Sequence, residues 1–171
     1  ELRLIHDHFS SANFYRLLLP EQVPDVERLL YLDADLLVRR PLRPLYETDL
    51  GTCPVGAAVD AHPEGSCRRL GIPVEESYFN SGMLLMDLPA WRREGIAEQA
   101  MHYLQTHNGD AEKTRFADQD ALNMVLRGRW RRVDDTWNFS VHDCRRDPRG
   151  LSPERRAVLA AGPAVIHYSN Y

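Results

Sequence analysis

Several patterns that would assign this 171-residue chain to common protein classes are missing from it. Its three cysteines, Cys53, Cys67 and Cys144, form no CxxC spacing, which predicts free thiols in a reducing cytoplasm rather than a zinc site or a disulfide framework. No run approaches the roughly 18 apolar residues of a membrane-spanning helix. The net charge of −4 gives no reason to expect nucleic acid as a partner, because such binding needs a clustered basic face.

The length and composition are those of one soluble globular domain, which we expect to span residues 1–171. Hydrophobic residues make up 43% and charged residues 27% of the chain, and neither an internal repeat nor a low-complexity tract interrupts it. Because the chain begins at Glu1 rather than at methionine, we expect it to be a segment of a longer protein. A monomer is the default expectation.

The most informative segment is residues 28–38, in which two apolar runs flank Asp33 and Asp35. In an extended backbone, residues i and i+2 point to the same side, so the two carboxylates can converge on one cation at a strand end. A bound divalent ion relieves the repulsion between them. The leucine, tyrosine and valine residues around the pair predict a strand buried on both faces of an α/β sheet. Such a carboxylate pair is typical of enzymes that handle phosphates.

Apolar periodicity along the rest of the chain predicts strands that alternate with helices, which is an α/β fold. Strands are expected at residues 29–32, 36–38, 55–59, 83–86 and 164–168. Helices are expected at about residues 10–19, 91–107 and 121–127, and after Ser152-Pro153; Ser10 and Ser11 would cap the first, and Pro20 would close it. Residues 41–44 predict a turn, and residues 62–73, with two prolines and two glycines, predict a loop.

Further polar residues stand where apolar elements end: Asp60, Asn80 with Gly82, residues 118–120, and His167. Ligands of open α/β sheets bind beyond the strand ends, so these residues could share one site. Each also has a simpler explanation. Asp60 and Asn80 could form turns, Asp118 could cap a helix, and a buried histidine is more often a core residue than a ligand. Position alone leaves these alternatives open.

The order and identity of the segments carry a resemblance to a known family. LLYLDADLLVRRPLRPLY, GAAVD, YFNSGMLLMDLPAWR, FADQDALNMVLRG, DTWNF and VIHYSNY follow one another along the chain. This series closely resembles glycosyltransferase family 8, whose retaining, metal-dependent members include bacterial lipopolysaccharide galactosyl- and glucosyltransferases and, more distantly, glycogenin. The resemblance runs from about Phe14 to Tyr168. A DxD or NxG motif alone would be a weak indication, whereas the ordered set is specific.

The resemblance implies a GT-A (nucleotide-diphospho-sugar transferase) fold, with a mostly parallel mixed sheet flanked by helices. Asp33 and Asp35 match the DxD motif, and His167 matches a C-terminal histidine; together they would hold Mn²⁺, or Mg²⁺ in its place, against the donor diphosphate. The residues implied to contact the UDP-sugar donor or the acceptor pocket are Arg16, Asp33, Ala34, Asp35, Asp60, Asn80, Ser81, Gly82, Asp118, Gln119 and Asp120, the last in a supportive role.

The implied reaction is the retaining transfer of glucose or galactose from a UDP-sugar to a saccharide acceptor, such as a lipopolysaccharide core or another glycan. Arg16 and the divalent ion would stabilise the leaving phosphate. Asp118 or the amide oxygen of Gln119 would stabilise the oxocarbenium-like centre, so these two are the expected catalytic residues. Because glutamine is a poor nucleophile, attack on the same face is expected, with Asp118 as the alternative nucleophile.

Two departures from the family pattern qualify these expectations. The family's N-terminal strand and helix, which grip the uridine base, are expected to be missing, as is the Lys-Pro-Trp segment after the histidine; Asn170 stands in place of a glycine. This chain alone is therefore expected to bind nucleotide weakly and to turn over little. The protein is expected to act in the cytoplasm. Association with the inner face of the cell membrane would be made by parts of the protein outside this chain. A nucleotide-sugar phosphohydrolase and a non-catalytic nucleotide-sugar-binding domain remain alternatives.

Overall fold

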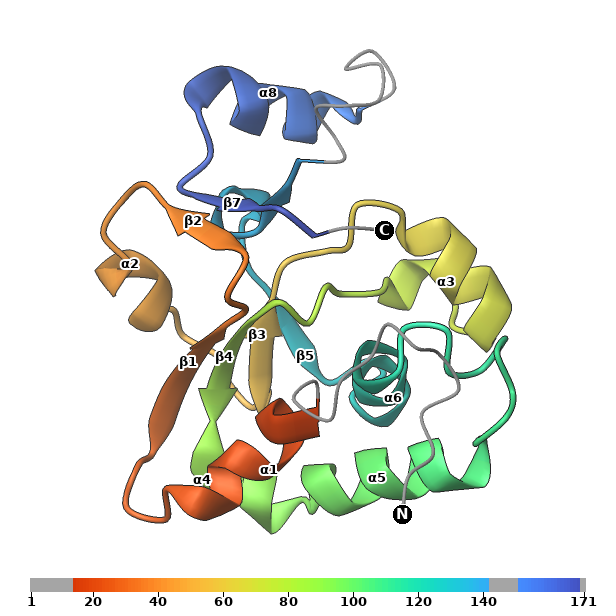
Figure 1. Cartoon of the computed structure of the whole chain (residues 1–171). Helices are drawn as coiled ribbons and strands as arrows, with labels where there is room; N and C mark the ends of the chain where they lie inside the picture. The colour runs from red at the N-terminus through yellow and green to blue at the C-terminus, as the bar shows by residue number, and fades with distance from the viewer. Residues whose placement is uncertain (1–13, 142–150, 170–171) are drawn as a thin grey trace.

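Seven short strands form two sheets in the computed structural model, which describes residues 14–141 and 151–169 (Figure 1). The four-stranded sheet has the order β1 (Arg28–Leu32), β4 (Met83–Asp87), β3 (Val55–Ala57), β5 (Trp130–Arg132). The three-stranded sheet has the order β2 (Leu36–Val38), β7 (Val165–His167), β6 (Phe139–Ser140). The predicted caps Ser10 and Ser11, together with Cys144 and Asn170, lie outside the described residues.

Helices cover the four-stranded sheet and border the smaller one (Figure 1). The larger core joins the sheet to α1 (Tyr15–Gln22), α4 (Leu88–Arg93), α5 (Ile96–Thr106) and α6 (Asp118–Val125). The other helices are α2 (Arg43–Tyr46), α3 (Pro63–Leu70) and α8 (Pro153–Ala161), with 3₁₀ turns η2 (Val74–Glu76) and η3 (Asp135–Trp137). Among the described residues, no helix is long and apolar enough to cross a membrane.

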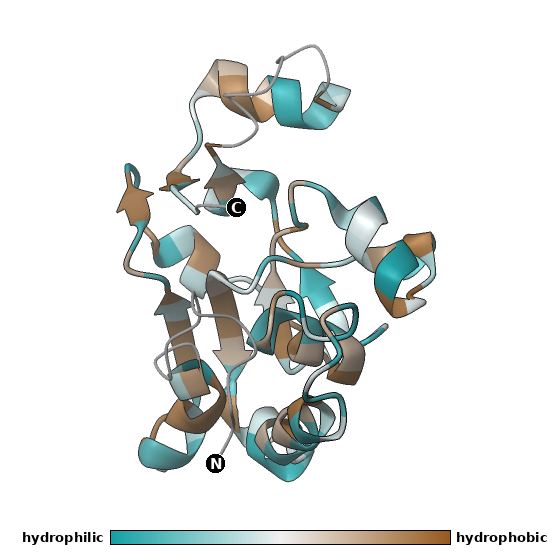
Figure 2. Cartoon of the chain, turned by 45° about the vertical axis from the view of Figure 1, so that its right-hand side comes forward, coloured by the Kyte–Doolittle hydropathy of each residue, from teal (hydrophilic) through white to brown (hydrophobic). Residues whose placement is uncertain are grey.

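The alternating side chains of β4 divide the hydrophobic core into two layers. Leu84 and Met86 pack into the larger cluster with Trp91, whereas Met83 packs on the opposite face of the sheet with Leu45. Successive strand residues point to opposite faces, so one apolar strand supplies both layers. Figure 2 shows β1 and β4 as largely hydrophobic, in agreement with this arrangement.

The sheet is mixed, but it is less parallel than expected. β1, β3 and β5 point in the same direction, as a mostly parallel sheet requires. Strand β4, however, lies between β1 and β3 and runs in the opposite direction. In the described sheet, therefore, only the β3–β5 pair is parallel, and both pairings of β4 are antiparallel.

Strand β1 is less buried than its apolar sequence predicts. Leu29 and Tyr31 contact the larger core, and Leu30 and Leu32 contact the smaller one, so both faces of the strand are covered. All five residues are nevertheless only half-buried. The reason is that β1 lies at the edge of the described sheet, where one side of its backbone has no described partner strand.

The predicted loop at residues 62–73 is wrong, because α3 occupies most of it. Pro63 stands in the first helical turn, where proline is compatible with a helix, and Gly71 ends the helix with a φ of 69°. Cys67 and Leu70, three residues apart, are buried on one side of α3. Proline and glycine at the ends of this helix were thus misread as loop residues.

Three other predicted helices differ in their bounds, and the one expected at residues 121–127 is α6, which begins and ends earlier. α1 continues through Pro20 to Gln22, and Arg92 donates hydrogen bonds to the carbonyl of Pro20 at 3.0 and 2.8 Å and to that of Val23 at 2.7 Å. The single helix expected at residues 91–107 is two helices, because Gly95 adopts a left-handed φ of 59° between α4 and α5. The predicted strands at residues 29–32 and 36–38 are confirmed.

We predict that the central position of β4 makes Leu84 a major contributor to stability. Leu84 is 0% exposed, whereas Leu37 in β2 is 47% exposed. Replacing Leu84 with alanine leaves a cavity in the larger core, so Leu84→Ala should lower the free energy of unfolding by about 2–5 kcal/mol. The matched variant Leu37→Ala should lower it by about 0.5 kcal/mol or less. Urea unfolding followed by circular dichroism measures both; equal effects would contradict the described packing.

Candidate functional site

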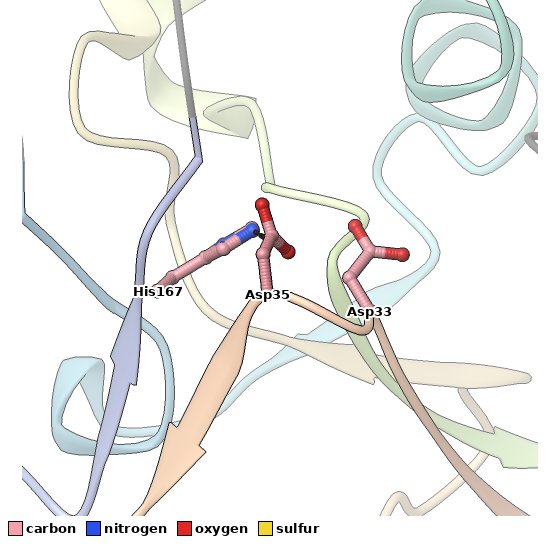
Figure 3. A group of neighbouring side chains, drawn as sticks. All are labelled: Asp33, Asp35 and His167. Atoms are coloured by element: carbon pink, nitrogen blue, oxygen red, sulfur yellow. Dashed lines mark ion pairs between the residues drawn. The ribbon is translucent and has the colours of Figure 1, made fainter.

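The turn that carries Asp33 and Asp35 connects the two sheets. Asp33 follows the last residue of β1, and its backbone N–H donates to the carbonyl of Gly82 at 2.8 Å. Asp35 precedes β2, in which Leu36 is paired with His167 of β7. Strand register therefore brings the turn, Gly82 and His167 to one point, and Figure 3 shows the side chains of Asp33 and Asp35 from the turn beside that of His167 from β7.

Asp33, Asp35 and His167 form a group that could hold a metal ion. One ligand atom from each lies within 4.8 Å of the others, and Nε2 of His167 lies 3.2 Å from Oδ1 of Asp35. The imidazole is buried, whereas the side chain of Asp35 is 49% exposed, so the group opens toward solvent on one side. Two carboxylate ligands and one imidazole suit a divalent ion such as Mn²⁺, and they leave positions for oxygen ligands from a substrate.

Gly82 makes room for this group. A Cβ atom at Gly82 would lie 2.3 Å from Cε1 of His167 and 3.0 Å from Oδ2 of Asp33. Because real Cβ atoms do not approach ring or carboxylate atoms this closely, any larger residue would displace the His167 ring, the Asp33 carboxylate or both. The glycine of the Asn-Ser-Gly segment is therefore required by the site, and not only by the turn before β4.

Arg16 of α1 links the DxD turn to α6. Its guanidinium forms ion pairs with Oδ1 of Asp33 and Oδ2 of Asp118, both at 3.0 Å, and donates to the carbonyl of Ser81 at 2.6 Å. It also lies over the ring of Tyr31, whose hydroxyl donates to Asp33 at 2.7 Å. One buried cation thus holds two carboxylates of the site in fixed positions.

The electrostatics of this cluster follow from burial and from these ion pairs. Burial raises the pKa of Asp118 to about 6, although Arg16 acts in the opposite direction. Burial works against the charged guanidinium of Arg16, but Asp118 and Asp33 outweigh it and raise its pKa. Burial also raises the pKa of the Tyr31 hydroxyl far above its ordinary value. Tyr31 therefore stays protonated and donates to Asp33.

Gln119 is held by hydrogen bonds at both ends of its amide. Its Oε1 accepts from the backbone N–H of Ser81 at 2.9 Å, and its Nε2 donates to the Tyr78 hydroxyl at 3.2 Å and to Oδ2 of Asp60 at 3.4 Å. Oδ2 of Asp60 also accepts from Nδ2 of Asn80 at 3.2 Å. These contacts bring Asp60, the Asn-Ser-Gly segment and α6 into one network.

Asp120 lies behind this network rather than in it. It is 0% exposed, pairs with Arg69 of α3 at 2.6 Å, and accepts from the Tyr78 hydroxyl at 2.7 Å. Burial, followed by the charge of Asp120, raises the pKa of Tyr78 well above its ordinary value. Asp120 therefore holds Tyr78, which in turn contacts Gln119, and its supportive role at the site stays a prediction.

Most of the residues singled out in the sequence meet here, but Ala34 contributes no interacting side chain and is exposed in the turn between Asp33 and Asp35. The simpler alternative considered for Asp118, a helix cap, is wrong, because the N-cap is Ala117 and Asp118 is the first residue of α6. Sequence reasoning missed Tyr31, Tyr78, Arg69 and Asn138. Tyr31, Tyr78 and Asn138 stand inside the quoted segments LLYLDADLLVRRPLRPLY, YFNSGMLLMDLPAWR and DTWNF, which was a usable signal, whereas Arg69 lies outside the quoted segments.

The sequence is similar to known proteins over most of its length, and several of them are named as glycosyltransferases. Its relatives include general stress protein A of Bacillus subtilis, 26% identical over 94% of this chain and 58% of the relative. Glycosyltransferase GlyF of Streptococcus pneumoniae is 30% identical over 96% of this chain and 37% of the relative. Lipopolysaccharide 1,3-galactosyltransferase of Salmonella typhimurium is 28% identical over 79% of this chain and 42% of the relative. The chain thus spans only about half the length of such relatives.

Solved structures show the same fold. The galactosyltransferase LgtC, crystallised with donor and acceptor sugar analogs, matches with a TM-score of 0.82 and 32% identity over 99% of this chain and 62% of that chain. GlyE of Streptococcus pneumoniae matches with a TM-score of 0.69 and 26% identity over 98% of this chain and 40% of that chain. The expected GT-A fold is therefore confirmed. The family model for glycosyl transferase family 8 matches residues 4–170, and the chain belongs to that family.

Proposed function

We propose that this chain is the donor-binding part of a retaining, Mn²⁺-dependent hexosyltransferase that transfers glucose or galactose from a UDP-sugar to a saccharide acceptor, such as a lipopolysaccharide core or another glycan. The observation that carries the proposal is the convergence of Asp33, Asp35 and His167 within 4.8 Å, beside a network that contains Asp118 and Gln119. Family membership and the galactosyltransferases among its relatives support it.

Asp33, Asp35 and His167 are the residues that would hold the ion. A divalent ion there would neutralise the charge that builds on the departing diphosphate. The exposed face of Asp35 marks the side from which the diphosphate would approach, since the other two side chains are more buried. Arg16 would act mainly by orienting Asp33 and Asp118, because both ion pairs and the Ser81 carbonyl already engage its guanidinium.

Asp118 and Gln119 are the candidates for stabilising the positive charge that develops on the sugar. Both begin α6 and both are buried, so their orientation is set before substrate binds. One solved relative, LgtC, was also crystallised as an active-site mutant with glutamate in place of glutamine, which supports an active-site role for a glutamine in this family. We assign that role to Gln119.

Attack on the same face remains our proposed route to retention. A double displacement would need Asp118 as the nucleophile, yet Oδ2 of its carboxylate is paired with Nε of Arg16 at 3.0 Å and the residue is only 3% exposed. A carboxylate held in this way is a poor nucleophile. On the same-face route, Asp118 and Gln119 need only remain in place while the acceptor attacks.

The first prediction tests the metal and the reaction together. Asp35→Ala removes the most exposed of the three candidate ligands, so it should abolish the Mn²⁺-dependent part of UDP binding and lower sugar transfer by about a hundredfold or more. Calorimetric titration with UDP, with and without Mn²⁺, measures the binding. Product formation from UDP-glucose or UDP-galactose with a panel of saccharide acceptors measures the transfer.

Asp49→Ala is the matched control, since Asp49 is an exposed aspartate beyond α2. It should retain both the Mn²⁺ dependence and the transfer. Full transfer by Asp35→Ala in the presence of Mn²⁺ would refute the proposed function. Donor hydrolysis without any acceptor product would favour the phosphohydrolase alternative, and donor binding without turnover would favour the non-catalytic one.

The second prediction concerns the space at Gly82. Gly82→Ala places a methyl group against His167 and Asp33, so it should weaken Mn²⁺-dependent UDP binding by about tenfold or more. Gly65→Ala is the control, because nothing lies within 4 Å of the added Cβ and the residue is inside α3. The control should keep the binding and gain about 0.4–1 kcal/mol of stability. Unchanged UDP binding in Gly82→Ala would contradict the prediction, because it would show that His167 and Asp33 can move aside without loss of the site.

The third prediction uses the raised pKa of Asp118, about 6 against an ordinary value of about 4. The unfolded chain releases this proton at a lower pH than the folded protein does, so the contribution of Asp118 to stability falls as the pH rises from about 4 to about 6 and is constant above. The metal-free protein should therefore lose on the order of 2–3 kcal/mol relative to Asp118→Asn over that window. Urea unfolding of both proteins at pH 4–8 measures the difference, and a difference independent of pH would contradict it.

A further inference from the structure

We propose that Asn138 is a positioning residue that fixes the tautomer of His167, so that the ring presents an unprotonated Nε2 to the metal site. The inference rests on the metal site of the proposed function and concerns how the chain prepares that site before an ion binds. Asn138 is 3% exposed and ends η3 directly before β6, which pairs with the strand of His167. A series of hydrogen bonds runs from Asn80 through Asn138 to His167, and the first bond determines the direction of the others.

The series begins with the side-chain amide of Asn80. The backbone N–H of Gly82 lies 2.9 Å from one end of this amide, and because a backbone N–H only donates, that end is the oxygen Oδ1. The other end, Nδ2, donates to the carboxylate of Asp60 at 3.2 Å. Both contacts require the same orientation, and a flipped Asn80 would satisfy neither.

The orientation of Asn80 determines that of Asn138. The Asn138 amide lies 2.9 Å from Oδ1 of Asn80, which is an acceptor, so Asn138 must present its Nδ2 donor there. Its oxygen Oδ1 then faces Nδ1 of His167 at 2.9 Å. An amide oxygen carries no hydrogen, and Nδ1 of His167 must therefore be the donor.

The consequence appears at the other ring nitrogen. A neutral imidazole carries one hydrogen, so with Nδ1 protonated its Nε2 has a free lone pair. This lone pair and Oδ1 of Asp35 lie 3.2 Å apart, an arrangement of two electron-rich atoms that a cation stabilises. Metal-binding histidines commonly donate their second N–H to an oxygen in this way.

A purely structural role for Asn138 is the competing explanation, and two substitutions separate the roles. Asn138→Ala removes both the contact to Asn80 and the acceptor for His167. Asn138→Asp keeps an oxygen facing Nδ1 of His167 but places its other oxygen against Oδ1 of Asn80, which is unfavourable. Both variants should therefore lose stability. Only Asn138→Ala should also lose the acceptor that keeps the proton of His167 on Nδ1.

The direct test is the protonation of His167 in the metal-free full chain, at a pH where the ring is neutral. Long-range ¹⁵N–¹H spectra of the histidine-labelled protein distinguish the two tautomers, and His167→Ala identifies the signal among the seven histidines. We expect the Nδ1–H form in the wild type and in Asn138→Asp, and a substantial Nε2–H population in Asn138→Ala. An Nε2–H ring in the wild type would overturn the proposal.

The second readout is calorimetric titration with Mn²⁺ alone. Asn138→Ala should bind Mn²⁺ about 10–100-fold more weakly than the wild type, whereas Asn138→Asp should bind at least as tightly. Asn123→Ala is the control for the loss of a buried asparagine, since Asn123 bonds only to the backbone of Phe79 and Gln119 in its described contacts. It should lose stability and retain Mn²⁺ affinity.

Equal Mn²⁺ affinity in the wild type and in Asn138→Ala would overturn the positioning role. A wild type that shows the Nδ1–H ring but binds no Mn²⁺ would refute the metal site of the proposed function while supporting the assigned tautomer. Neither measurement depends on sugar transfer, so failure of the transferase proposal and failure of this one remain distinguishable.

Discussion

The buried guanidinium of Arg16 is the interaction on which the site depends. It bridges Asp33 at the end of β1 and Asp118 at the start of α6, so one cation from α1 joins a strand and a helix that are distant in the sequence. Without it, two carboxylates would face each other with little solvent between them, which is strongly unfavourable. The C-terminal end of α1 is held in turn by Arg92, through the carbonyls of Pro20 and Val23. Fold and site therefore share the same contacts.

Strand register explains how the remaining groups reach the same place. Antiparallel pairing of β1 with β4 puts Gly82 beside Asp33, and pairing of β2 with β7 puts His167 beside Asp35. The turn of the DxD motif thus joins the two sheets. The four-stranded sheet places Gly82 next to this turn, and the three-stranded sheet places His167 next to it. A slip of one residue in either ladder would turn the side chain of His167 or the space at Gly82 away from the site. Backbone pairing thus brings these groups together, and the ion pair with Arg16 then holds Asp33 in place among them.

The residues of the site were more predictable from the sequence than the elements between them. Carboxylates at i and i+2 after an apolar strand predicted that Asp33 and Asp35 would lie together, and they do. They do so in a turn between β1 and β2, however, and not in the extended backbone from which the prediction was made. The role of Asn138 and the register of His167 depend on pairing between β6 and β7, which local sequence does not encode. The helix α3 was missed because Pro63 and Gly65 suppress a helical prediction, while tertiary packing of Cys67 and Leu70 outweighs that propensity.

The balance of charge suggests why such a site needs an ion. Asp120 is compensated by Arg69, and Arg16 serves both Asp33 and Asp118, but Asp35 is paired only with His167 among the described contacts. Carboxylates therefore outnumber the cations around the DxD turn. A diphosphate approaching this turn would meet net negative charge and would be repelled. On the proposed function, a divalent ion would reverse the sign of the charge at the solvent-exposed carboxylate of Asp35, and the carboxylates that would repel the free donor would then hold the metal-bound donor.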